Sequence, residues 1–137
     1  MTAPFAHEMM NPKNWKAASG YANGVAAEGR LLFLGGLIGW NAQQEFETDD
    51  FVGQVDQCLQ NICEVLAVAG AGPQHLVRLT WYITDKQEYL AALPEIGKAY
   101  RAHLGRNFPA MAMVQVAGLI EDRAKVEIEA TAVIPKS

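Results

Sequence analysis

VEIEATAV, at residues 126–133, decides the fold of this chain, because it alternates apolar and polar side chains as a half-buried β-strand does. The pattern extends outward to predict a strand over 125–134. The segment before it, FPAMAMVQVAGL at residues 108–119, predicts another strand over 110–117, and the charged turn at 121–123 separates the two.

A third strand pattern runs from His75 to Thr84. Its alternation directs one set of side chains toward a core and the other set toward an environment that suits polar groups. The first set is Val77, Leu79, Trp81 and Ile83, and the second set is Leu76, Arg78, Thr80 and Tyr82.

Helices are predicted on both sides of this strand. Residues 48–50 (Thr-Asp-Asp) supply N-cap chemistry for a long helix whose apolar residues recur at spacings of three and four, and the Gly-Ala-Gly-Pro run at 70–73 ends it. Asp85 predicts the cap of a short helix. Pro94 suits the first turn of a further helix that runs to about Leu104.

Two short strands are predicted before the long helix. Residues 21–27 and 30–34 have strand character, and Glu28-Gly29 between them suits the turn of a hairpin. Three glycines follow, and they indicate that the backbone comes close to another part of the molecule. They are Gly35, Gly36 and Gly39.

The order of these elements predicts an α+β fold with two main helices packed on one face of a mixed sheet. The other face of that sheet is half polar. Such a face is either solvated or shared with other subunits, and the pattern alone leaves both alternatives open. Its residues are Arg78, Thr80, Tyr82, Lys125, Glu127, Glu129 and Thr131.

Composition narrows the class of protein. With 137 residues, 50% of them apolar, and a net charge of −4, we expect one domain over 1–137. No apolar run is long enough to span a membrane and no signal-peptide pattern begins the chain, so we expect a cytoplasmic protein without a membrane partner. The acidic balance argues against a nucleic-acid partner. Cys58 and Cys63 are expected to be free thiols, and no metal-ligand spacing or cofactor motif is visible.

Taken together, the segments resemble the Rid (YjgF-like) family of small enamine and imine deaminases. The resemblance runs from Gly20-Tyr21-Ala22 to Ile134, and the joint order of its motifs carries it. It implies a chorismate-mutase-like fold and a homotrimer in which three sheets surround a central barrel. Each cleft between neighbours would then hold a small-molecule ligand with residues of two chains. The other motifs are 31–36 (LLFLGG), Gln54, Asn61-Ile62, Ala69-Gly70, 77–85 (VRLTWYITD), Phe108-Pro109-Ala110 and 126–130 (VEIEA).

The resemblance also implies a chemistry and a site. Family deaminases add water to reactive species such as 2-aminoacrylate and release ammonia. By resemblance Glu127 positions the water and Tyr21 lies at the cleft. Three positions depart from the family pattern, because Met111 stands where the deaminases carry a substrate-binding arginine, Gly35 replaces a serine, and Leu93 occupies a position where asparagine is common.

Without that arginine, whose planar guanidinium pairs bidentately with a carboxylate, the cleft would suit a more apolar or uncharged imine. Met111, Leu93 and Trp40 would make it more apolar. Arg78 offers an alternative, since its strand parity places it on the same face as Glu127 and it would replace the missing guanidinium. Structural roles stay open as well: Glu127 as an ion-pair partner of Arg78 or Lys125, Tyr21 as a packing residue, and Met111 as an apolar filler.

Three functions follow from these observations. The first is a Rid-like hydrolase with an altered substrate preference. The second is a non-catalytic trimer that binds a metabolite or responds to oxidants through its thiols and methionines. The third, an endoribonuclease or translation inhibitor, ranks last because an acidic chain without a basic groove suits RNA poorly.

Overall fold

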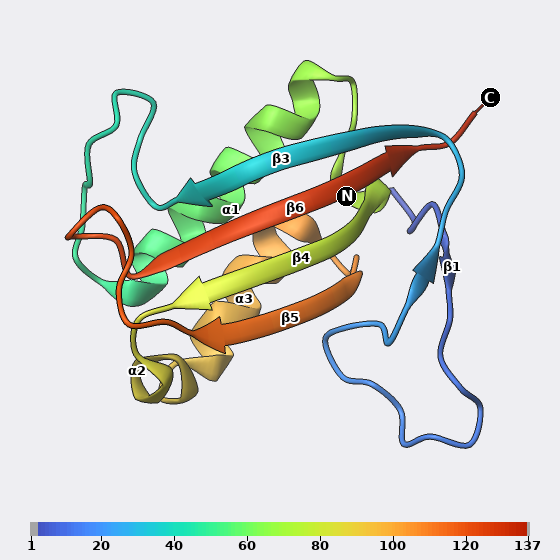
Figure 1. The fold of residues 1–137 in the computed structure, drawn as a ribbon, viewed down its shortest axis with the longest axis horizontal. Helices are drawn as coiled ribbons and strands as arrows, with labels where there is room; N and C mark the ends of the chain where they lie inside the picture. Colours follow the sequence, from blue (N-terminus) through green and yellow to red (C-terminus); the bar gives the residue numbers. More distant parts are fainter. Residues whose placement is uncertain (1–2, 137) are drawn as a thin grey trace.

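The computed structural model describes residues 3–136, and Figure 1 shows their arrangement as helices packed on one side of a sheet. The fold is α+β, as predicted. Its strands are β1 (Glu8–Met9), β2 (Val25–Ala26), β3 (Arg30–Ile38), β4 (Leu76–Ile83), β5 (Ala110–Gln115) and β6 (Val126–Ile134). Its helices are α1 (Phe51–Val68), the 3₁₀ turn η1 (Pro73–His75), α2 (Lys86–Leu90) and α3 (Leu93–Leu104).

The main sheet is mixed, with the strand order β3-β6-β4-β5. The β6 strand pairs antiparallel with both β3 and β4, while β4 and β5 run parallel. The α1 and α3 helices pack against each other and cover one face, which leaves the opposite face open (Figure 1). Both the mixed sheet and the one-sided placement of the two main helices confirm the prediction.

The ends of the helices form where the sequence places them. Asp50 is the N-cap of α1 and accepts a hydrogen bond from the Gly53 amide at 2.9 Å. Gly70 follows α1 with φ of 74°, a left-handed conformation that glycine adopts without strain. Asp85 caps α2 through the amides of Gln87 and Glu88.

A buried glutamine ties α1 to the start of β6. The Gln54 side chain is fully buried, and its amide nitrogen donates to the carbonyls of Thr48 and Arg123. Its oxygen accepts from the Lys125 backbone amide at 2.8 Å. Close contact here also explains a glycine, since a Cβ on Gly39 would lie 2.5 Å from the Gln54 carbonyl oxygen. The predicted close backbone approach at Gly39 is therefore present.

Two local predictions are wrong. Strand β2 does not form a hairpin with β3, because it pairs antiparallel with β1, a segment far back in the chain. Gly29 instead lets the chain pass close to the end of β6, where a Cβ would meet the Ile134 carbonyl. The alternation of β4 also breaks at its start, where an irregularity between Leu76 and Arg78 turns the Leu76 side chain into the core.

The two faces of the sheet differ in composition. Apolar side chains of β3, β4 and β6 fill the space between the sheet and α1 and α3. The open face carries the polar residues that the sequence predicted, but Phe33 and Leu31 of β3 also lie on it, with Phe33 75% exposed. A single chain therefore leaves apolar surface uncovered beside its polar groups.

Candidate functional site

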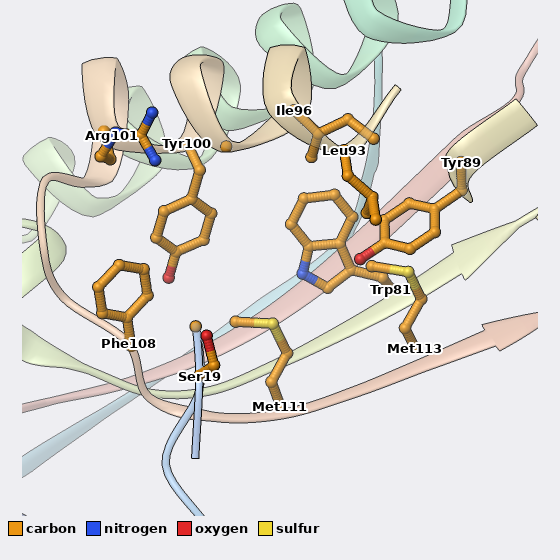
Figure 2. Close-up of a pocket in the computed structure, with 12 residues that line it drawn as sticks. Ser19, Trp81, Tyr89, Leu93, Ile96, Tyr100, Arg101, Phe108, Met111 and Met113 are labelled. Atoms are coloured by element: carbon orange, nitrogen blue, oxygen red, sulfur yellow. The ribbon is translucent and has the colours of Figure 1, made fainter. Parts of the chain in front are cut away.

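A cavity of about 290 Å³ lies between α3 and β5 on the helix-covered side of the sheet. Figure 2 shows that side chains from both elements, and from the ends of neighbouring strands and loops, point toward one another around it. Most of the lining is apolar or aromatic, as is usual for small-molecule sites. The lining residues are Ser19, Gly20, Trp81, Tyr89, Leu93, Ile96, Gly97, Tyr100, Arg101, Phe108, Met111 and Met113.

The sheet register sets the floor of the cavity. Met111 pairs with Leu79 and Met113 with Trp81, so the two methionines project from β5 on the helix-covered side. Leu93, the first residue of α3, approaches from above (Figure 2). The structure thus brings together two of the predicted substrate-binding residues, Met111 and Leu93.

The cavity is close to electrically neutral. Burial raises the pKa of Tyr89 and also that of Tyr100, so both phenols stay protonated at neutral pH. The Tyr100 hydroxyl donates to the Asn107 carbonyl at 2.6 Å, and its ring stacks on Phe108 with centroids 5.3 Å apart. Among the described residues that line the cavity, only Arg101 carries a charge, and it lies on the exposed side of α3.

One buried polar atom faces this cavity without a partner. Of the buried side-chain nitrogens and oxygens in residues 3–136, Trp81 Nε1 is the one that makes no hydrogen bond. The Trp81 side chain belongs to the core, with 2% of the residue exposed. In Figure 2 its nitrogen edge is directed toward the space bounded by Ser19, Met111 and Tyr100.

Glu127 lies on the other face of the sheet. It pairs with Tyr82 of β4 and Ile38 of β3, and a Cβ on Gly36 would come within 2.9 Å of its carboxyl carbon. The absent side chain at Gly36 therefore leaves room for the Glu127 carboxylate. Two residues further along, Glu129 accepts a hydrogen bond from the Tyr82 hydroxyl at 2.7 Å, and this bond raises the pKa of Tyr82.

Arg78 shares the open face with Glu127, as its parity predicted, but the two are far apart. Arg78 pairs with Thr131 and Tyr82 with Glu127, a separation of four residues or roughly 13 Å along the strand. Within residues 3–136, Glu127 forms no ion pair with Arg78 or Lys125, and the Lys125 ammonium lies 3.4 Å from Glu88. Within one chain, Arg78 is also on the face opposite Met111.

The remaining candidate residues occupy separate places. Tyr21 is partly exposed beside the start of β5, where the neighbouring Ala22 amide donates to the Pro109 carbonyl at 3.0 Å. Trp40 packs on Phe46 in the loop after β3, with ring centroids 5.8 Å apart, and does not line the cavity. Gly35 is exposed on β3, and a Cβ there would meet open space. A serine at position 35 would therefore fit without a clash.

Neither cysteine is poised for thiolate chemistry. Burial raises the pKa of Cys58 to about 12, and burial also raises the pKa of the half-buried Cys63. The two thiols are free, as predicted. In the part of the chain that the structure describes, no three His, Cys, Asp or Glu side chains come close enough to share a metal ion, and no helix has the length and apolar character needed to cross a bilayer.

Comparison with known proteins agrees with this geometry. A family model described as endoribonuclease L-PSP matches residues 12–134. Protein DfrA of Myxococcus xanthus is 34% identical over 120 residues, which cover 86% of this chain and 88% of the relative. The crystal structure of YyfB from Yersinia pestis, a protein of unknown function in the conserved Rid protein family, is 32% identical with a TM-score of 0.81, covering 93% of this chain and 98% of that one. The chain belongs to the Rid family.

Another relative of this Rid-family chain has a named activity. A 2-iminobutanoate/2-iminopropanoate deaminase from Capra hircus is 31% identical over 114 residues, which cover 82% of this chain and 79% of the deaminase. The family and the fold expected from the sequence are thereby confirmed. The homotrimer and the roles of individual residues stay predictions.

Sequence reasoning missed several residues of the cavity. Met113 could have been predicted from the sequence, because it lies two positions beyond Met111 on the same strand and must face the same side of the sheet. Trp81 and Tyr100 gave no such signal, since their positions fit ordinary core patterns of a strand and a helix. Their role in the cavity becomes visible only when α3 is placed over β5.

Proposed function

We propose that this Rid-family chain hydrolyses an imine or enamine whose body is apolar and which carries no carboxylate beside the reacting carbon. The apolar lining of the cavity supports this proposal. Met111 and Leu93 stand there at the positions where the resemblance places arginine and asparagine. A carboxylate buried against them would have no charged partner at these two positions, because Arg101 lies on the exposed side of α3, and losing one member of such a pair costs about 2 to 5 kcal/mol.

The reaction needs water and one base. The water oxygen forms a bond to the carbon of the protonated imine and gives up a proton to the base, the nitrogen takes up a proton, and the carbon–nitrogen bond then breaks to leave a carbonyl compound and ammonia. A carboxylate that orients or deprotonates the water contributes about 10²- to 10⁴-fold to the rate. Glu127 is the carboxylate that we assign to this step, and the absence of a side chain at Gly36 leaves space for the carboxylate itself.

The proposed site is shared between chains. Glu127 and the cavity lie on opposite faces of one sheet, so a single chain does not bring them together. A neighbouring chain that covers the open face would bury Phe33 and Leu31, which are exposed on the same face as Glu127, toward the other end of β6. In a closed ring of identical chains, each neighbour would then present its Glu127 to the next cavity. The homotrimer is the form of this ring that we propose.

Other functions receive less support. A thiol-based response to oxidants suits the structure poorly, because the Cys58 thiol is fully buried and its pKa is about 12. RNA cleavage, which the family description names, would need a basic surface. The basic group on and after α3 consists of Lys98, Arg101, His103 and Arg106, and His103 already pairs with Asp56 at 2.9 Å.

Ammonia release provides the test. A flavin-dependent amino-acid oxidase or amine oxidase would generate imines in place, giving one series with a carboxylate and one series without, and ammonia would be followed with and without this protein. We expect acceleration for imines of benzylamine or isoamylamine and little for 2-aminoacrylate. Faster turnover of 2-aminoacrylate than of the uncharged imines would contradict the proposed preference.

The role of Glu127 has a matched control on the same strand. Glu127→Gln should lower the rate by about 10²- to 10⁴-fold while ligand binding persists. Glu129→Gln alters a carboxylate two residues away on the same face and should leave most of the rate intact. If the protein binds the ligands but never accelerates ammonia release, it is a binding module rather than a hydrolase.

A further inference from the structure

The Trp81 indole nitrogen is the starting point for a more specific assignment of the ligand. A buried N–H without a hydrogen-bond partner costs about 1 to 3 kcal/mol, so proteins seldom keep one. Trp81 Nε1 is such a group, in a residue that is 2% exposed, and its nitrogen edge faces the cavity (Figure 2). A ligand with a hydrogen-bond acceptor would satisfy it.

The Tyr100 hydroxyl, which also lines the cavity, is already engaged. Tyr100 donates its proton to the Asn107 carbonyl, so it does not compete with Trp81 as a donor toward the ligand. Around the indole, Met111, Met113 and Ile96 offer only apolar surface. The cavity therefore combines a fully buried indole donor with a largely apolar enclosure, and the hydroxyl-bearing Ser19 and Tyr89 complete its lining.

Size limits the ligand further. A dry cavity of about 150 Å³ in another protein holds benzene. The present cavity, at about 290 Å³, has room for one ring with a short substituent. The methionines at its floor adapt to irregular shapes, and aromatic rings stack well on Phe108 and Trp81.

We propose that this cavity binds an uncharged molecule of about one substituted ring, whose carbonyl or imine group accepts the Trp81 Nε1–H bond. The assignment rests on the proposed function, because a carbonyl compound is the product of imine hydrolysis. It makes Trp81 a residue that determines specificity: its N–H selects molecules with an acceptor over hydrocarbons of the same shape. Arg101 at the exposed edge does not contribute to the binding of such a ligand.

Nuclear magnetic resonance gives a test that is independent of turnover. The chain contains three tryptophans, so a ¹⁵N-labelled sample shows three indole resonances, and Trp81→Phe identifies the one from Trp81. Acetophenone is the probe, and ethylbenzene, which has nearly the same shape but no acceptor, is its control. We expect acetophenone to bind roughly 2- to 10-fold more tightly than ethylbenzene and to shift the Trp81 resonance.

Variants separate this inference from general effects on packing. Trp81→Phe should remove the difference between the two probes even if both bind more weakly, whereas Trp40→Phe, which alters an indole outside the cavity, should preserve it. Equal binding of both probes to the unaltered protein would overturn the assignment, and so would a difference that survives in Trp81→Phe. Tighter binding of benzoylformate that is lost in Arg101→Gln would also overturn it, because the ligand would then be anionic.

Ammonia assays on the same samples distinguish the two proposals. If acetophenone binds through Trp81 but no imine is hydrolysed, the proposed function fails and the ligand assignment stands. If uncharged imines are hydrolysed while Trp81→Phe leaves probe discrimination unchanged, the function stands and the assignment fails.

Discussion

The two faces of the sheet differ in how much of a site each can build alone. On the helix-covered face, α3 and β5 enclose a cavity with an apolar floor and one fully buried, unpaired donor, Trp81 Nε1. On the open face, Glu127 lies toward one end of β6, and the exposed Phe33 and Leu31 side chains lie toward the other end, with no element of the same chain packed over them. The proposed binding cavity and the proposed proton-transfer group thus lie on opposite faces of one sheet, so the proposed reaction depends on contact between chains.

Mixing two inactive variants should give the largest effect. Glu127→Gln would supply an intact cavity, and Met111→Trp, with its cavity filled, would supply an intact glutamate. In a randomly mixed ring, about one quarter of the clefts would combine both working halves. Ammonia release should therefore rise from background to about a quarter of the unaltered rate after the chains are unfolded and refolded together. No recovery would mean that both groups act within one chain.

Measurements of folding stability should show the next-largest difference between the two faces of the sheet. Trp81→Ala on the covered face should cost about 3 to 5 kcal/mol, because it empties part of the core. Phe33→Ser on the open face should cost much less within a chain, since Phe33 is 75% exposed. Urea unfolding at several protein concentrations provides the measurement: the cost of Phe33→Ser should depend on concentration if chains cover it. An equal, concentration-independent cost for both variants would remove the distinction between the faces.

Adding a charge to the cavity should change its ligand. Met111→Arg places a guanidinium where only Arg101 at the edge is charged, and it should favour carboxylate-bearing imines such as 2-aminoacrylate by roughly 30-fold or more, equivalent to about 2 kcal/mol. Met113→Arg, two residues further along the same strand, is the control for a charge elsewhere in the cavity. Thermal unfolding would verify that both variants fold. Unchanged selectivity in Met111→Arg would show that position 111 does not contact the ligand.

The pKa values of two tyrosines should show the smallest difference between the two faces of the sheet. The pKa of Tyr82 is raised chiefly by its hydrogen bond to Glu129, whereas the pKa of Tyr89 is raised by burial. Glu129→Ala should therefore bring the Tyr82 pKa back toward its ordinary value of 10.0 and leave the Tyr89 pKa raised. Titration of ¹³C-labelled tyrosine would measure both. A shift at both positions would mean that the faces are electrostatically coupled.

The raised pKa of Tyr82 determines whether folding stability rises or falls with pH. Because the pKa of Tyr82 is higher in the folded than in the unfolded chain, the folded state keeps this proton longer. The contribution of the Tyr82–Glu129 bond is present below about pH 10 and is lost as the pH rises beyond it. In Glu129→Ala, the loss of folding stability above about pH 10 should be smaller. If the free energy of unfolding keeps the same dependence on pH, other groups cause the loss.

The regular parts of the fold were predictable because local patterns determine them. The alternation at 126–133 and the caps at Asp50 and Asp85 appear in the structure where the sequence places them. The pairing of β2 with β1 was not predictable, since it joins two-residue segments distant in sequence and depends on tertiary contacts. The irregularity at Leu76 was not predicted for a related reason. One extra residue in the strand reverses which face of the sheet a side chain occupies, and the prediction assumed unbroken alternation.

The candidate site was predictable only in part. Resemblance placed Met111 and Leu93 in one site, and the structure brings them together in the cavity. It also suggested Trp40, which lies elsewhere. The unpaired nitrogen of Trp81 could not be foreseen, because hydrogen-bond satisfaction depends on every neighbour that the fold supplies.

The buried amide of Gln54 has a consequence for strand registration. A slip of β6 by two residues would keep every side chain on its own face but would move Glu129 into the place of Glu127. Neither the apolar pattern nor the charge pattern of VEIEATAV strongly opposes such a slip. The bond from the Lys125 amide to the Gln54 oxygen does, because it fixes one position of β6 relative to α1. A single glutamine in the core thus favours the register in which Glu127, rather than Glu129, stands beside Gly36.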